Sequence, residues 1–323
     1  MKINALLSAP LVLIVALFFW IPDASAINAV ASIKDIQGQV DIERQHSKLA
    51  ARNGLILYDK DTVATGDHSR ATIVFRDGSI IRLFGNTRFM IEKSVEVKKG
   101  SRRFLHKIFL KLGSFWGKFS RKYQNTMIRT PTATAGVKGT IIAVTEQNGK
   151  MGISLTTGAV TINNDSETIT LQPGQMLMGI TQRGSISDKI QNLPYRLVFK
   201  SDRPEVIIPE SGNEVEIFFT LQMVQKAKNL NASRTGPVYI SHSFDNIRFE
   251  PGIHLNERGY ARIKATVQPF QGRENLRETA EITALMDGET FIDVDAGQAI
   301  LTLIHAGWKT KTLKIDVKSD SIE

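Results

Sequence analysis

The chain has 323 residues, with 41 Lys and Arg against 32 Asp and Glu, which gives a net charge of +9. It contains no cysteine, which excludes disulfides, thiolate metal sites and cysteine nucleophiles. This length can bury a core without disulfides and allows two domains of ordinary size.

The first 26 residues have the features of a secretory signal. Lys2 begins the chain with a positive charge, Ala5 to Ile21 form an apolar segment, and Ala24-Ser25-Ala26 is a small-x-small cleavage site. An uncleaved membrane anchor is the alternative, because the apolar segment is just long enough to span a bilayer. We expect a bacterial protein, periplasmic or secreted, whose mature chain of 27–323 has no integral membrane segment.

Residues 27–195 predict an all-β domain of short strands and hairpins. Asp77-Gly78 lies between two β-branched runs in "ATIVFRDGSIIRLF", and Asn148-Gly149 occupies the same place in "IIAVTEQNGKMGISL". Both dipeptides are typical of tight hairpin turns, because glycine adopts a positive φ without steric cost. Apolar residues alternate with polar ones from Val160 to Met178, as expected for strands with one buried face.

The positive charge is concentrated in one interval. No acidic residue occurs from Val97 to Thr145, and the interval contains eleven cations: Lys98, Lys99, Arg102, Arg103, Lys107, Lys111, Lys118, Arg121, Lys122, Arg129 and Lys138. Such a patch favours anionic partners. The candidates are an acidic envelope protein, an anionic glycan or a lipid headgroup. Nucleic acid is disfavoured as a partner, because an exported protein seldom meets it.

The centre of this interval, "RRFLHKIFLKLGSFWGKFSRK", has two interpretations. On a helix its aromatic and aliphatic residues would share one face beside the lysines, as in an interfacial membrane helix. Gly113 and Gly117 disfavour a helix, so strands are favoured, with a short helix possible over residues 102–109. A solvated face is the alternative role for any single lysine. The candidate binding residues are Arg102, Arg103, Lys107, Lys111, Trp116, Lys118, Arg121 and Lys122.

The stretch "TPTATAGVKGT", residues 130–140, resembles a phosphate-binding loop at first sight. Its lysine, however, precedes the second glycine, and the "IIAVT" that follows is a strand pattern rather than a helix. We favour a structural bend, with Pro131 ending ladder pairing and Gly136 and Gly139 permitting a bulge or a close backbone approach.

Residues 196–323 predict a second all-β domain. Segments such as "VEIFFTLQ" and "AILTLIHAGW" alternate, and turn residues separate them. This pattern is typical of an immunoglobulin-like sandwich, here without its inter-sheet disulfide and with Trp308 as a possible core aromatic. Such a domain could serve only as a spacer, because this fold says little about function.

Several motifs of the first domain, in order, resemble the FecR domain of bacterial envelope proteins. "IRTPTATAGVKGTIIAV", with Pro131, Gly136, Gly139 and Thr140, is similar to the family's T-P-x-A-x-A-G-V-[RK]-G-T core. The upstream segment resembles the family through Gly66, Ser69, Arg70, Ala71, Asp77, Gly78 and Ser79. "LKLGSFWGKF", "GAVTI" and "LQPGQMLM" continue the similarity, which runs from about Ala31 to Ile180.

The resemblance implies a periplasmic β-rich domain used in protein contacts. In the best-known members, that domain relays a signal from an outer-membrane receptor to a cytoplasmic anti-sigma segment. Only a few residues precede the apolar stretch here, which disfavours sigma regulation. The chain is more similar to stand-alone exported members joined to further modules.

No constellation for catalysis, cofactor binding or metal binding stands out. The six histidines lack ligand spacing, and "DKD" at 59–61 and "DVDAG" at 293–297 lack the remaining residues of a calcium loop. We therefore expect a non-enzymatic binding or scaffolding module that uses a basic face. A periplasmic signalling adaptor is the alternative, and an envelope hydrolase would need an acid–base pair in a cleft.

Overall fold

The structure is a computed structural model that describes residues 29–98, 100–101, 104–120, 125–208, 213–228, 230–244, 246–269, 277–288 and 291–305. The proposed signal segment and Trp308 lie outside the described residues. Strands dominate the described chain, so the predicted all-β class is confirmed. No helix in these ranges is long and apolar enough to cross a membrane.

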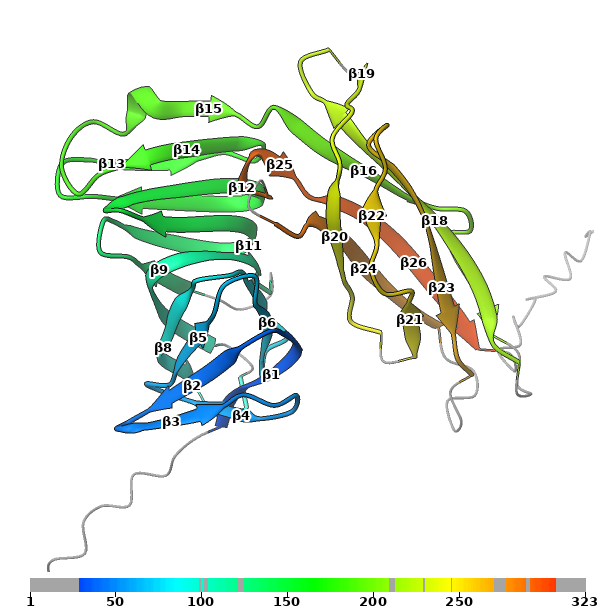
Figure 1. Ribbon diagram of the computed structural model, residues 1–323, viewed down its shortest axis with the longest axis horizontal. Helices are drawn as coiled ribbons and strands as arrows, with labels where there is room; N and C mark the ends of the chain where they lie inside the picture. The colour runs from blue at the N-terminus through cyan, green and yellow to red at the C-terminus, as the bar shows by residue number, and fades with distance from the viewer. Residues whose placement is uncertain are drawn as a thin grey trace, which may run out of the picture.

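The first part of the chain forms one sheet of 15 strands (Figure 1). Its elements are β1 (Ala29–Gln37), β2 (Val40–Arg44), β3 (Ser47–Ala50), β4 (Ile56–Tyr58), β5 (Thr62–Thr65), β6 (Arg70–Phe75), β7 (Ile80–Leu83), β8 (Arg88–Glu96), β9 (Phe104–Lys118), β10 (Asn125–Arg129), β11 (Thr134–Gln147), β12 (Lys150–Asn163), β13 (Thr168–Leu171), β14 (Gln175–Ile180), η1 (Ser187–Lys189) and β15 (Ile190–Asn192). The predicted hairpins at Asp77-Gly78 and Asn148-Gly149 are confirmed, since they join β6 to β7 and β11 to β12.

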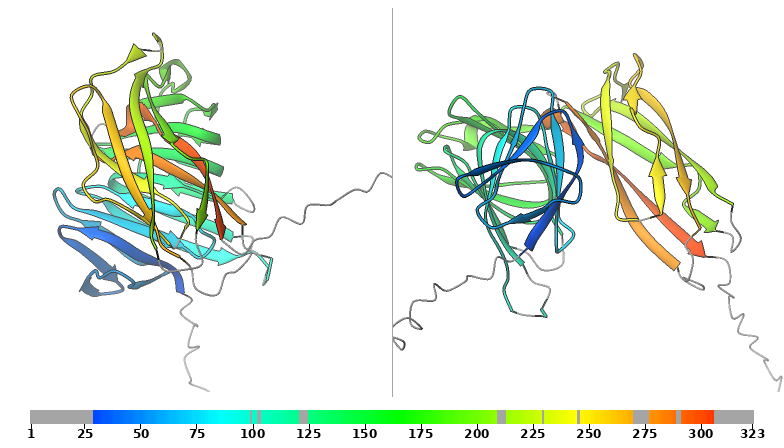
Figure 2. Two further views of the ribbon diagram at one scale, coloured as in Figure 1. Left: turned by 90° about the vertical axis from the view of Figure 1, so that its right-hand side faces the viewer. Right: turned by 60° about the horizontal axis from the view of Figure 1, so that its bottom comes forward.

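The sheet curls around an apolar core instead of lying flat. Alternate side chains of strands from β1 to β14 contribute to one buried cluster, including Ile33, Ile73, Phe89, Phe115 and Val144. The blue and cyan strands close into a roll, and the green strands stack beside it (Figure 2). The period-two pattern therefore marks the inward face correctly.

Three long strands turn corners that let the sheet curl. β9 pairs with β8 and β10 through its first half and with β7 and β11 through its second half, and Gly113 lies between these halves. β11 changes partner near Gly139 and β12 near Gly158. All three glycines have a positive φ, which other residues adopt at a steric cost. The sequence also allowed a short helix over residues 102–109. This alternative is wrong for the described residues, because β9 begins at Phe104.

The second part consists of two sheets that pack face to face. One contains β16 (Tyr195–Ser201), β18 (Val215–Gln225), β19 (Leu230–Asn231), β21 (Ile247–Phe249), β23 (Tyr260–Val267) and β25 (Val294–Asp295). The other contains β17 (Glu205–Ile208), β20 (Gly236–Ser241), β22 (His254–Leu255), β24 (Arg277–Met286) and β26 (Gly297–His305), and η2 (Phe291–Asp293) follows β24. Side chains such as Phe219 of β18 and Leu301 of β26 share the core between the sheets. The immunoglobulin-like assignment stays a prediction.

The two parts lie side by side, and β20, β24 and η2 contact the first part (Figure 1). The change of sheet falls between Asn192, the last residue of β15, and Tyr195, the first of β16. The core of the second part includes four residues of the first: Phe84, Trp116, Ile141 and Ala143. The junction is therefore a packed apolar contact.

Candidate functional site

Lysines and apolar side chains share one exposed surface on the first part, which we call the outer face. We define it by the outward side chains of β8 to β11: Lys93, Val95, Leu105, Lys107, Phe109, Lys111, Met127, Arg129, Gly136 and Lys138. Their neighbours in sequence, such as Ile108, Ile128 and Val137, point into the core. One row of cross-strand neighbours runs through Lys93, Lys107, Met127, Gly136 and Thr161.

The outer face is positively charged and partly apolar. Glu92 lies beside it and pairs with Arg129 at 2.8 Å, so this acid does not neutralise the lysines. Val95 and Met127 are 38% and 39% exposed, in a sheet whose other apolar side chains are mostly buried. A surface that combines exposed apolar groups with charge of one sign is typical of a contact site for an oppositely charged partner.

The predicted binding residues separate into three groups: those on the outer face, those in the junction and those outside the described residues. Lys107 and Lys111 lie on the outer face. Lys118 lies instead in the junction, where its Nζ is 3.0 Å from Glu281 Oε1 and donates to Thr283 Oγ1 at 3.1 Å. Trp116 is 3% exposed and packs in the core of the junction. The remaining four, Arg102, Arg103, Arg121 and Lys122, lie outside the described residues.

The phosphate-loop-like stretch forms a turn and a strand. Thr130 Oγ1 accepts hydrogen bonds from the backbone N–H groups of Thr132 and Ala133, and Pro131 occupies the exposed tip. Gly139 has φ +60° at the corner of β11, and Thr140 after it is fully buried. No helix follows, so the backbone offers no helix N-terminus to an anion.

Gly136 differs from the other glycine of this stretch. It lies exposed in the middle of the outer face, without a positive φ. A Cβ placed there would have the backbone oxygen of Thr161, 3.9 Å away, as its nearest neighbour. The fold therefore has room for a side chain at Gly136, and its absence leaves the outer face flat there.

Asp77 anchors a buried polar network under the β6–β7 hairpin. Its carboxylate accepts from the Ser79 backbone N–H at 2.9 Å and lies 2.9 Å from His106 Nε2, while His106 Nδ1 is 2.8 Å from Ser94 Oγ. Burial opposes the ionisation of Asp77, but the hydrogen bond and charge of His106 and the bonds from Ser79 outweigh it and lower the pKa of Asp77. His106 is 1% exposed, so this Asp–His–Ser arrangement ties the β6–β7 turn to β8 and β9 instead of presenting a nucleophile to solvent.

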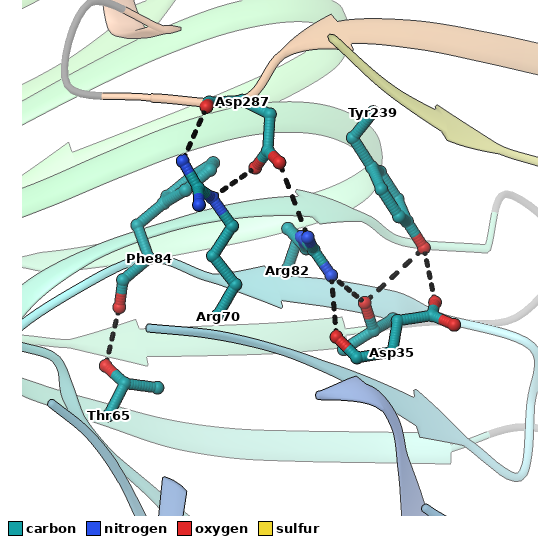
Figure 3. Close-up of polar contacts among 8 residues, drawn as sticks. Asp35, Thr65, Arg70, Arg82, Phe84, Tyr239 and Asp287 are labelled. Carbon is teal, nitrogen blue, oxygen red and sulfur yellow. Dashed lines mark hydrogen bonds and ion pairs between the residues drawn. The ribbon is translucent and has the colours of Figure 1, made fainter. Parts of the chain in front are cut away.

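The junction between the two parts is built around buried arginines (Figure 3). Arg82 on β7 is 1% exposed, and its guanidinium is 3.4 Å from Asp287 Oδ2 after β24. Arg70 on β6 donates to the backbone carbonyl of Asp287 at 2.9 Å. Arg70 Nε also lies 3.1 Å from Asp287 Oδ1, so one carboxylate of the second part serves two arginines of the first.

Tyr239 on β20 completes this network. Arg82 lies over its ring, 4.3 Å from the centroid, and the Tyr239 hydroxyl donates to Asp35 Oδ2 at 2.9 Å. Burial and the charge of Asp35 raise the pKa of Tyr239, so its hydroxyl stays a donor. Apart from Arg70 in the family-like segment, no sequence pattern points to this network, because the hydrogen-bonded pairs that cross the junction are more than 200 residues apart along the chain.

Residues 61–161 match the family model described as FecR protein. This segment is a FecR domain. The match runs from just before β5 to the second half of β12 and therefore includes the β6–β7 hairpin, β9 and the three glycine corners. It confirms the resemblance for these residues.

Two crystal structures of a candidate anti-sigma factor from Parabacteroides distasonis, at 1.65 and 2.50 Å, are also similar. Each is 17% identical with a TM-score of 0.34, and the alignment covers 41% of this chain and 59% of that one. No curated protein matches. Among the described residues, no group of three His, Asp or Glu side chains is placed to hold a metal ion.

Proposed function

We propose that this chain is a non-enzymatic, exported adaptor that binds an acidic partner protein through the outer face of its FecR domain. The observation that carries the proposal is that the lysines of the outer face lie beside exposed apolar side chains on β8 to β11. Buried apolar contacts supply affinity at protein interfaces, and complementary charge speeds encounter and sets orientation. A glycan or lipid headgroup would use the lysines but not Val95 and Met127.

The FecR family supports signalling in the cell envelope as the setting of this contact. In this proposal the FecR domain makes the contact, and the second part holds it in place through the junction. The adaptor would sit in the periplasm, where a receptor or an anchored regulator could supply the acidic surface.

The test is crosslinking of the tagged protein in its own cells, followed by mass spectrometry of what is captured. A dominant protein partner is expected for the natural chain. The variant Lys107→Glu/Lys111→Glu should capture much less of that partner, and the binding that remains should depend less on salt, because fewer ion contacts remain.

The matched control is Lys150→Glu/Lys200→Glu, which makes the same change in net charge at exposed positions away from the outer face. It should retain the partner. Equal capture by both variants would contradict the proposal, and so would capture of only lipid or glycan. Circular dichroism and melting temperature would show whether each variant still folds.

A further inference from the structure

Gly136 lies in the interior of β11, where a glycine weakens a strand. A strand needs a glycine for a positive φ, for a close neighbour inside the fold or for a bulge. The φ of Gly136 is not positive, and the nearest atom to a Cβ there would be Thr161 O, 3.9 Å away. The pairing of residues 134–138 with β12 has no shift of register, so no bulge lies there. The described fold therefore does not require a glycine at this position.

Gly158 on the neighbouring strand shows the contrast. Its φ is +89°, and a Cβ there would lie 2.7 Å from the backbone oxygen of Gly139. The corner glycines are thus explained by the fold of the FecR domain itself, whereas Gly136 is not.

The missing side chain leaves a shallow gap in the outer face. Its cross-strand neighbours are Met127 of β10 and Thr161 of β12, and both side chains are exposed. Because neighbouring strands lie about 4.8 Å apart, the gap is one residue wide. A glycine inside a strand often marks the place where a ligand or another backbone approaches closely. No described residue of this chain approaches Gly136 in that way.

The lysines around the gap define the charge of the approaching group. Lys138 lies two residues along β11 and Lys107 lies two strands away on β9, which places them about 7 and 10 Å from Gly136. A helix surrounds its main chain with side chains, whereas an extended segment leaves its main chain exposed between side chains that alternate in direction. An extended segment can therefore bring its backbone to Gly136 and acidic side chains to both lysines.

We propose that the partner binds the outer face through an extended acidic segment whose main chain lies over Gly136. This inference rests on the proposed function, because it specifies how the acidic partner contacts the outer face. Gly136 then determines specificity, since any side chain there would hold the segment away from the sheet and from Met127.

The experiment compares Gly136→Ala and Gly136→Val with the natural chain, each as the full mature protein. The melting temperature should stay the same or rise, because alanine and valine suit an ordinary strand position better than glycine does. The probe for binding is the protein that the natural chain captures by crosslinking in its own cells. Its capture should fall about threefold for Gly136→Ala and roughly tenfold or more for Gly136→Val, as expected when a gap in a packed contact is filled.

The control is Ala50→Val, which adds bulk at an exposed strand position on β3, outside the outer face. It should capture the partner like the natural chain. A lower melting temperature for Gly136→Val would show that the glycine is structural and would overturn the inference. Full capture by Gly136→Val, with capture still reduced in Lys107→Glu/Lys111→Glu, would overturn the inference and leave the proposed function in place. Capture of no protein by the natural chain would overturn both.

Discussion

At the scale of single residues, Asp77 is important for more than its turn. The Asp-Gly dipeptide predicts a hairpin, and the Asp77 side chain does cap that turn through the backbone N–H of Ser79. The same carboxylate is also the buried partner of His106 from β9. One residue thus links a local turn to a contact 29 positions away along the chain.

Replacing Asp77 by Asn should lower the free energy of unfolding by about 3 kcal/mol at neutral pH, since it removes one partner of a buried charged contact. The pKa of Asp77 is lower in the folded than in the unfolded chain. Its stabilising contribution is therefore complete above the unfolded pKa and is lost as the pH falls through the folded pKa.

Urea unfolding of the natural chain and of Asp77→Asn, measured from neutral pH to below pH 4, checks this prediction. The difference between the two proteins should shrink toward acid pH. Asp165→Asn, an exposed acid in the β12–β13 turn, is the control. A difference that stays constant with pH would show that the charge of Asp77 is not what matters.

At the scale of secondary-structure elements, the corners of β9, β11 and β12 shape the FecR domain. At Gly158, a Cβ would lie 2.6 Å from Thr140 Cγ2 and 2.7 Å from the backbone oxygen of Gly139. At Gly113 it would lie 2.5 Å from the Cα of Thr87. The β12 corner therefore packs too closely against the β11 corner for any side chain, and the β9 corner packs too closely against Thr87, in addition to the positive φ at each glycine.

Gly158→Ala should therefore lower the free energy of unfolding by about 3 kcal/mol, from backbone strain and steric overlap together. Gly136→Ala is the matched control on the neighbouring strand, with an ordinary φ and space for the added methyl group. It should change stability by less than about 1 kcal/mol and in the stabilising direction. Chemical denaturation of both variants tests this contrast, and similar losses for the two would contradict it.

At the scale of the whole molecule, the junction joins the two parts through Asp287. Arg82 is almost fully buried there and Arg70 is partly buried. Phe84 packs against Phe291 with ring centroids 4.3 Å apart. Because apolar packing and a shared carboxylate act at one contact, we expect the FecR domain and the second part to move as one body.

Asp287→Ala should destabilise the junction by roughly 3–5 kcal/mol, because it leaves a buried arginine without its carboxylate. The two parts should then separate, which small-angle X-ray scattering would detect as a larger radius of gyration and limited proteolysis as cleavage near 193–195. The control Glu205→Ala removes an exposed pair with Arg277, which contributes at most about 1 kcal/mol. An unchanged radius for Asp287→Ala would mean that apolar packing alone holds the junction.

Much of the FecR domain could be predicted from local patterns. Strand alternation and the Asp-Gly and Asn-Gly turns have short-range physical causes, and they appear in the structure where the sequence indicates. The roles of Lys118 and Trp116 could not be predicted in this way. Both alternate along β9 like their neighbours, but the second half of β9 faces the junction, and this depends on where the second part packs.

The sequence by itself determined the all-β class and the concentration of positive charge, because hydrophobic period, turn chemistry and composition are local properties. Its motifs, by their similarity to a known family, also identified the FecR domain. Only the tertiary structure decided which lysines share a free surface and which pair with acids. It also brought Arg82 to Asp287 and Lys118 to Glu281, residues from separate parts of the chain. Contacts of that kind depend on how the two parts pack against each other, and no single segment of the sequence determines that packing.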